Sequence, residues 1–266
     1  MRLTATRSSV TSAGDAGAAE LWTPAELDGV QLWLDASDAS TITLNGSTVS
    51  QWDDKSGNNR HATQATASNQ PTYTTAGLNG KNVLTFSNAG STYLSIPSDV
   101  DDYFPYQSAF IVYSDTSTAL YVTPLGGRFH SSATRAAYHG HQYNTQIFSG
   151  SFTAPETLNG DNFKNGTDIG DGLSTPRPGS TPAIFSYIAD AEEDPFDVDR
   201  RLGIIGADFA STAIRGITGL IAEIVILENA ASVADRKKTE GYLAHRWGLS
   251  ADLPSDHPYK SSAPTV

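Results

Sequence analysis

Residues 220–227 read LIAEIVIL, a run that is apolar at every position except Glu223. A short run that is apolar on both faces is typical of a central strand in a β-sandwich. Further strand-like segments lie along the chain, and the Asn79-Gly80 turn dipeptide before one of them indicates a β-hairpin. These segments are Gly29–Leu34, Val49–Trp52, Lys81–Phe86, Ser108–Tyr113, Ala119–Val122 and Ala183–Ile188. The sequence therefore predicts an all-β fold.

The composition suits many short strands joined by turns, because the 266 residues include 23 Gly and 13 Pro and only 38% are hydrophobic. With 4 Trp, 11 Tyr and 10 Phe, the chain can still build a core. The formal net charge of −12 argues against nucleic acid or an anionic membrane as the main partner. Cysteine is absent, which excludes disulfide frameworks, Cys-ligated zinc and thiol catalysis.

One amphipathic helix is predicted near the C-terminus, over Ser232–Trp247. Ser232 fits the N-cap, Asp235 can reach back to it, and Gly248 suits a left-handed C-cap. The predicted apolar face consists of Val233, Thr239, Tyr242, Leu243 and Trp247. The Pro-rich tail, Leu253–Val266, is expected to be extended.

Residues 1–20 are small and polar and lack periodicity, so we expect an N-terminal arm outside the core. No apolar segment follows Arg2 and Arg7, so we expect no secretory signal and a protein that is made in the cytoplasm. No run of about 18 apolar residues predicts a transmembrane helix. Because Arg2 and Arg7 are basic on an acidic chain, we expect the arm to attach the protein to a particle.

Several segments, taken in order, carry a family resemblance. They are Leu32–Asp38 (LWLDASD), Trp52–Asn58 (WDDKSGN) with His61-Ala62, Gly77–Gly80 leading into Leu84–Phe86, Ile221–Leu227, Arg236–Leu249 and Leu253–Tyr259. Together they resemble the laminin-G-like, concanavalin-A-like jelly-roll superfamily, especially its phage-associated branch. The resemblance spans residues 28–260, with 100–200 poorly matched. It implies a jelly-roll β-sandwich over residues 21–266, with one C-terminal helix.

A calcium site at a rim of the sandwich is one interpretation of the polar turn after Trp52. The resemblance allows such a site, because several domains of this kind bind calcium there. Asp35, Asp38, Asp53 and Asp54 would contribute oxygens to an ion that takes about six to eight. The alternative is an ordinary turn in which side chains of residues 53–58 bond their own backbone.

Other polar segments leave alternatives open. Four tyrosines in polar surroundings could hold a glycan or lie in the core: Tyr103, Tyr106, Tyr138 and Tyr143. Three histidines could form a metal site or lie at the surface: His130, His139 and His141. The acidic run over residues 190–199 is expected to be a solvated loop, with an ion site or a contact for a basic partner as alternatives. Asn159–Gly172 is expected to be a loop.

Motifs of an enzyme are absent from the sequence. A retaining glycosidase needs two acids about 5 Å apart, whereas Glu223 and Glu228 would point to opposite faces of one strand. The chain contains no Gly-x-Ser-x-Gly, no P-loop and no dinucleotide fingerprint. A binding protein is therefore favoured over an enzyme.

These observations favour a non-enzymatic phage virion accessory protein, on the head or the tail, that displays a lectin-like sandwich at the virion surface. Its expected partners are capsid or tail proteins, cell-surface polysaccharide and further copies of itself. One alternative is a carbohydrate-binding adhesin module of a tail fibre or a bacterial surface protein. A second alternative is a polysaccharide-degrading enzyme, since the fold hosts such enzymes.

Overall fold

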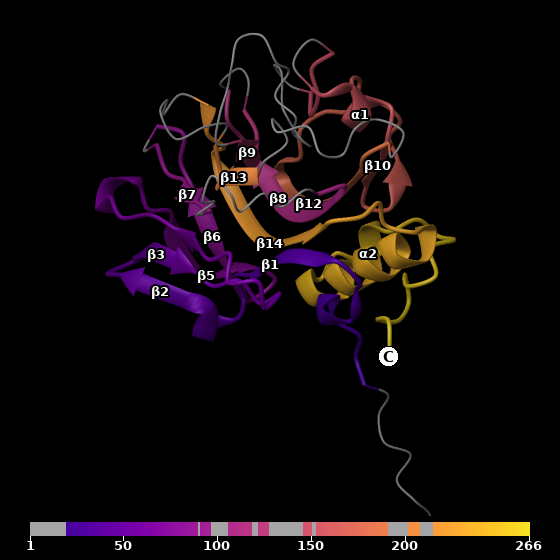
Figure 1. Ribbon diagram of the computed structural model, residues 1–266, viewed down its shortest axis with the longest axis horizontal. Coiled ribbons are helices and arrows are strands. Elements are labelled where there is room, and N and C mark those ends of the chain that lie inside the picture. The colour runs from indigo at the N-terminus through magenta and orange to yellow at the C-terminus, as the bar shows by residue number, and fades with distance from the viewer. Residues whose placement is uncertain are drawn as a thin grey trace, which may run out of the picture.

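Fourteen β-strands form the framework of the described part of the chain, which is seen in a computed structural model (Figure 1). The described residues are 20–89, 91–96, 106–118, 122–127, 146–150, 153–190, 202–207 and 215–266. The strands are β1 Val30–Asp35, β2 Ile42–Asn45, β3 Thr48–Trp52, β4 Ala62–Thr63, β5 Thr72–Leu78, β6 Lys81–Phe86, β7 Leu94–Ser95, β8 Ser108–Asp115, β9 Leu125–Gly127, β10 Asp161–Lys164, β11 Thr167–Asp168, β12 Gly179–Ile188, β13 Leu202–Ile205 and β14 Gly219–Leu227. The helices are α1 Pro155–Leu158 and α2 Val233–Trp247, with 3-10 turns at Pro24–Glu26, Ala39–Thr41, Ala67–Asn69 and Ser250–Asp252.

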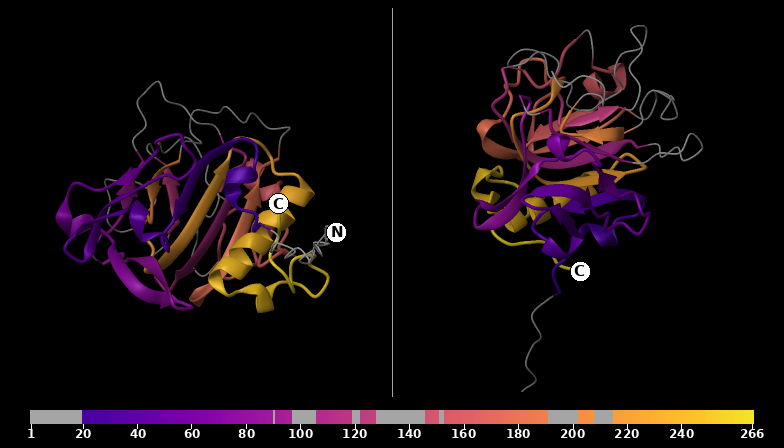
Figure 2. Two further views of the ribbon diagram at one scale, coloured as in Figure 1. Left: turned by 90° about the horizontal axis from the view of Figure 1, so that it is seen from below. Right: turned by 90° about the vertical axis from the view of Figure 1, so that its left-hand side faces the viewer.

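The strands form one antiparallel hydrogen-bonded path, in the order β11-β10-β12-β8-β14-β6-β5-β3-β4-β7-β13-β9. Strand β1 lies beside β14, and β2 lies beside β3. The path curls back on itself, because side chains of β7, β9 and β13 share one buried cluster with those of β8, β12 and β14. The resulting two layers confirm the predicted all-β sandwich (Figure 2).

Strand β14 lies in the middle of this path, with β8 along one edge and β6 and β1 along the other. Its side chains alternate between two buried clusters, one between the sheet layers and one beneath α2. Ile221, Ile224 and Ile226 belong to the first cluster, and Ala222, Val225 and Leu227 belong to the second. Both faces are covered, which explains why the run is apolar on both sides and confirms the predicted central strand.

A β-bulge near the start of β14 changes this alternation once. Ile221 lies opposite Tyr113 of β8, whereas Glu223 lies opposite Val112, so β14 has one extra residue between them. A bulge of this kind re-aims a side chain. Ala222 and Glu223 consequently both face α2, and a carboxylate lies beneath the helix.

Helix α2 packs on the outer face of the sheet that β14, β8 and β12 provide. Ser232 accepts a hydrogen bond from the backbone N–H of Asp235, and Gly248 ends the helix with φ of 69°, as predicted. Trp247 is fully buried. Val233 is 63% exposed, so its predicted place in the apolar face is wrong. The buried residues of α2 begin only at Arg236, almost one turn later.

Two Asn-Gly dipeptides form hairpin turns. Asn79 and Gly80 join β5 to β6 with φ of 47° and 77°, the left-handed pair of a type I′ turn, which confirms the predicted hairpin. Asn165 and Gly166 join β10 to β11 in the same way, with φ of 49° and 74°. The prediction of a loop over Asn159–Gly172 is therefore wrong, because the second dipeptide carries the same signal as the first.

The C-terminal tail folds in turns, so the prediction of an extended tail is also wrong. The backbone N–H groups of His257 and Lys260 bond the carbonyls of Pro254 and His257. Proline fixes φ at a value that suits turns as well as extended chain. The end of the tail then pairs with the start of the described chain, where Thr265 forms a bridge to Leu21.

Two further sequence predictions concern a strand at 119–122 and membrane-spanning helices. The strand expected at 119–122 lies outside the described residues except for Val122. Among the helices of the described part, none is long and apolar enough to cross a membrane.

We predict that replacing Trp247 by alanine lowers the free energy of unfolding by roughly 3–5 kcal/mol, because it empties a fully buried indole site. Val233→Ala is the matched control from the same helix, and its exposed side chain predicts a change within about 0.5 kcal/mol. Urea unfolding of both variants measures the difference. Equal stability of the two variants would contradict this packing of α2.

Candidate functional site

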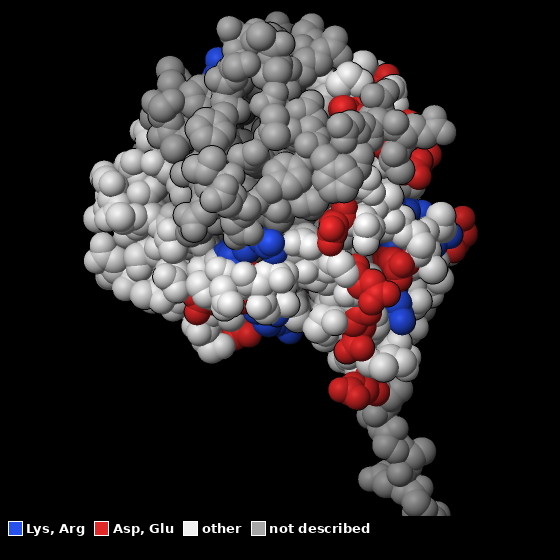
Figure 3. Space-filling view, viewed as in Figure 1, with Lys and Arg blue, Asp and Glu red and all other residues white. Residues whose placement is uncertain are grey.

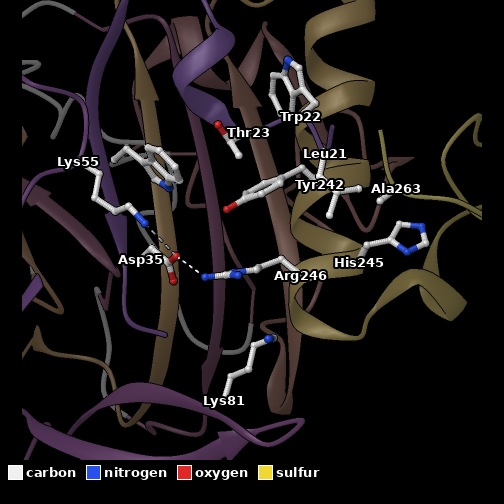
Figure 4. Close-up of a pocket in the computed structure, with 11 residues that line it drawn as sticks. Leu21, Trp22, Thr23, Asp35, Lys55, Lys81, Tyr242, His245, Arg246 and Ala263 are labelled. Carbon is white, nitrogen blue, oxygen red and sulfur yellow. Dashed lines mark hydrogen bonds and ion pairs between the residues drawn. The ribbon is translucent and has the colours of Figure 1, made fainter. Parts of the chain in front are cut away.

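A cavity of about 390 Å³ opens between β1 and α2, on the helix side of the sheet (Figure 4). The two ends of the described chain complete its wall, since the N–H of Trp22 bonds the carbonyl of Pro264 and the N–H of Val266 bonds that of Glu20. The lining residues are Leu21, Trp22, Thr23, Trp33, Asp35, Lys55, Lys81, Tyr242, His245, Arg246 and Ala263. The pocket therefore combines aromatic rings, cations and one carboxylate.

Asp35 ends strand β1 and holds two of the cations in place. It is fully buried, and its Oδ2 accepts hydrogen bonds from Nη2 of Arg246 at 2.7 Å and Nζ of Lys55 at 3.4 Å (Figure 4). Its Oδ1 accepts from the backbone N–H and the hydroxyl of Ser37. Every oxygen of Asp35 is thus bonded within the chain, and the carboxylate orients Arg246 along the pocket wall.

Glu223 lies beneath the pocket, directly opposite Asp35 in the pairing of β14 with β1. Its Oε1 accepts from Nε1 of Trp33 at 2.8 Å and the hydroxyl of Tyr242 at 3.0 Å, and its Oε2 accepts from Nε1 of Trp247 at 2.6 Å. Burial, and next the charge of Asp35, raise the pKa of Glu223 to about 7, although the three hydrogen bonds act against this rise. Glu223 thereby links a strand to the helix through three aromatic side chains.

The pairing of Asp35 with Glu223 places two acids on neighbouring strands, where Cβ atoms lie about 4.5–5.5 Å apart. Asp35 is 188 residues from Glu223 in the sequence, so the spacing of acids along one strand, as between Glu223 and Glu228, does not reveal this pair. Acid–base chemistry needs a carboxyl oxygen that meets the substrate, but both oxygens of each acid are bonded to neighbouring residues and both side chains are fully buried. All four carboxyl oxygens therefore have partners within the chain.

Among the four residues of the predicted calcium site, Asp35 and Asp38 share a contact with Lys55, and Asp53 and Asp54 contact other groups. Lys55 bridges Asp35 and Asp38, and the hydrogen bonds from Ser40 and Lys55 lower the pKa of Asp38 to about 2. Asp53 accepts from Nε2 of Gln51. Within the described ranges no group of three or more acids or histidines is arranged to hold a metal. The calcium site stays a prediction.

The alternative interpretation of this turn is confirmed at Asp54. Its carboxylate accepts from the backbone N–H groups of Trp33, Ser56 and Arg60 and from the hydroxyl of Ser56. These hydrogen bonds fix the backbone of residues 54–60, the segment that carries Lys55. This is the hydrogen bonding of an Asx-type turn, extended to a neighbouring strand.

Most of the other predicted site residues lie outside the described residues. These are Tyr103, Tyr138, Tyr143, His130, His139, His141, Arg2, Arg7 and the acidic run after Asp190. Tyr106 is described and is 1% exposed in the core between the layers, which is the second of its two predicted places.

The residues that line the pocket were missed by sequence reasoning, apart from Asp35. They come from six separate segments, so no local motif unites them. One signal was present: Glu223 interrupts an apolar strand, and a buried acid requires donors. Those donors proved to be Trp33, Tyr242 and Trp247.

No protein-family model and no curated protein matches this chain. Among solved structures, a Trypanosoma rangeli sialidase is similar with a TM-score of 0.37 and 13% identity, over 87% of this chain and 36% of that one. The same sialidase as a covalent intermediate with 2,3-difluorosialic acid gives 0.36 and 12%, over 83% and 34%. The chain thus spans about a third of the length of these proteins. Likeness at this level says nothing about ligand or activity.

We predict that Glu223→Gln removes a pH dependence of stability. The folded pKa of about 7 exceeds the ordinary value of 4.5, so between these values the folded protein binds more protons than the unfolded one. The free energy of unfolding therefore falls as pH rises through this window, by roughly 3 kcal/mol. Glutamine does not titrate, so the variant lacks this fall.

Urea unfolding gives the free energy of unfolding of wild type and variant at pH values from 4.5 to 8. The effect is the difference between the two proteins in how this free energy changes with pH. The variant is also less stable by about 1–3 kcal/mol at low pH, because its amide N–H₂ replaces an acceptor of an indole N–H. Glu228→Gln is the matched control, since Glu228 follows β14 but is exposed. The assignment fails if Glu223→Gln keeps the full pH dependence of wild type.

Proposed function

We propose that the chain is a non-enzymatic, lectin-like binding domain whose pocket between β1 and α2 holds a saccharide. Its proposed setting is that of an accessory protein of a phage virion, with an adhesin module as the alternative. The observation that carries the proposal is the pocket itself: aromatic rings and hydrogen-bond donors line it, while the neighbouring carboxylates are committed to other contacts.

The side chains of the pocket have the chemistry that sugars need. Tyr242 is half-buried and offers ring surface, and the largely buried Trp22 meets it edge to face with centroids 6.0 Å apart. Thr23 and Lys81 add polar groups to the lining. A cavity of about 390 Å³ is at the small end of ligand pockets, which measure roughly 300–1,000 Å³. This size favours the end of a glycan chain over its middle.

The pocket is preorganised, which favours affinity because little ordering is needed on binding. Asp35 holds the guanidinium of Arg246, and Glu223 holds the phenol of Tyr242. Lys55 lies over the ring of Trp33, 4.5 Å from its centroid. These contacts fix most of the wall before any ligand arrives.

The virion setting rests on the basic arm and on the place where it meets the body. Residue 20 lies beside the C-terminal end, because Glu20 accepts from the N–H of Val266. A tether through residues 1–19 would therefore leave the body at a single point, next to Leu21 and the pocket. Arg2 and Arg7 would anchor such a tether to an acidic capsid or tail surface.

We predict that Ala263→Trp abolishes saccharide binding by filling the pocket, while the melting temperature stays close to that of wild type. Ser262→Trp is the matched control, because Ser262 is the neighbouring residue and is exposed. Co-sedimentation of the pure protein with insoluble polysaccharides, in the absence of any particle, measures binding. The proposal is lost if no polysaccharide retains wild type, or if both tryptophan variants bind as wild type does.

A second prediction concerns attachment of the protein to virions through residues 1–19. Deleting residues 1–19 keeps Glu20 and its contact with Val266, so the melting temperature should not change. Incorporation into virions should be lost, because the basic anchor is gone. Quantitative mass spectrometry of purified particles from a complemented phage gives the copy number. A normal copy number for the truncated protein would place the attachment surface on the sandwich.

A further inference from the structure

We propose that the saccharide held in this pocket carries an oxyanion, a carboxylate or a sulfate ester, and that Lys81 and Arg246 receive it. This inference rests on the proposed function and specifies its ligand class. It follows from the charges of the lining, from the bonding of each cation, and from the direction in which the two cations point.

The lining of the pocket contains more basic than acidic side chains, although the chain as a whole is acidic. Asp35 is the single carboxylate in the lining, against the three strong bases Lys55, Lys81 and Arg246. The chain as a whole carries a net charge of −12, and one face shows acidic side chains gathered beside α2 (Figure 3). An excess of cations in a pocket of such a protein favours an anionic ligand there.

Lys81 is the cation without a partner. It is half-buried at the start of β6, and its ammonium makes no hydrogen bond or ion pair with any described residue. Lys55 differs, because it already bridges Asp35 and Asp38. A half-buried ammonium that no acid neutralises is free to bind an anion from outside.

Arg246 retains unused donors although it bonds Asp35. Its Nη2 serves both Asp35 and Ser37, its Nε is buried, and its Nη1 makes no hydrogen bond with any described residue. The guanidinium is planar and presents paired N–H groups, a geometry that matches carboxylate and sulfate oxygens. Arg246 can therefore hold Asp35 with Nη2 and an external oxyanion with Nη1.

Lys81 and Arg246 line the same pocket from different elements. Lys81 extends from β6 toward the guanidinium, which comes from α2 (Figure 4). Two like charges that converge repel each other, and an anion between them turns that repulsion into two attractions. Glu223 does not occupy this place, because it is sealed beneath Trp33, Tyr242 and Trp247.

Paired probes test the inference on the full chain by titration calorimetry. Oligogalacturonate is compared with its methyl ester, which has the same backbone without the charge, and sulfated dextran is compared with dextran. We expect the charged member of at least one pair to bind about tenfold more tightly at low salt, or 1.4 kcal/mol. The two pairs distinguish a carboxylate ligand from a sulfate ester. The advantage should shrink as salt is raised.

Lys81→Gln should remove most of this tenfold advantage of the charged probe over its neutral partner. Lys237→Gln is the matched control, since it makes the same charge change on α2 outside the pocket. Equal losses in the two variants would mean general attraction to a charged surface and would overturn the inference. Loss in Lys81→Gln alone supports it.

The outcomes separate the inference from the function on which it rests. If neutral and charged probes bind equally and Ala263→Trp abolishes both, the saccharide function stands and the oxyanion is wrong. If no probe binds and the insoluble polysaccharides of the co-sedimentation assay do not either, the function itself fails.

Discussion

The buried carboxylate of Glu223 is the contact on which the arrangement of sheet, helix and pocket depends. A carboxylate without partners in such a place would cost several kcal/mol, and here three donors from β1 and α2 meet it. Those donors belong to Trp33, Tyr242 and Trp247, which are all large rings. One acid therefore sets the positions of three rings, two of which line the pocket. The bulge in β14 makes this possible by turning Glu223 toward the helix.

A second buried acid fixes α2 at a different point. Both oxygens of Glu240 bond Nη1 of Arg236, and they also contact Ser186 of β12 and His257 of the tail. The guanidinium of Arg236 lies 3.6 Å from the centroid of the Phe163 ring on β10. The helix is thus held by directional bonds as well as by apolar contact. Such bonds define the rotation of α2, and hence the direction in which Arg246 points.

Local signals predicted the framework, whereas the pocket arises from contacts between distant segments. The run at 220–227, the caps of α2 and the Asn79-Gly80 turn are each decided within about ten residues, which is the range of periodicity and turn chemistry. The pocket instead joins residues 21–23 with Lys81 and Arg246. The error at Val233 has a related cause: spacing along a helix identifies a face, but not the residue at which the sheet beneath begins.

The central position of β14 has a consequence for the order in which the protein is made. The strand occupies residues 219–227, yet its partners β1, β6 and β8 are all synthesised earlier. During translation, the edge of each of these strands that pairs with β14 therefore stays unpaired until β14 is made. Unpaired strand edges favour aggregation. Helix α2 is made later still, so the outer apolar face of the sheet is the last to be covered. The sandwich must consequently close after most of the chain has left the ribosome, and slow growth at low temperature should favour soluble protein.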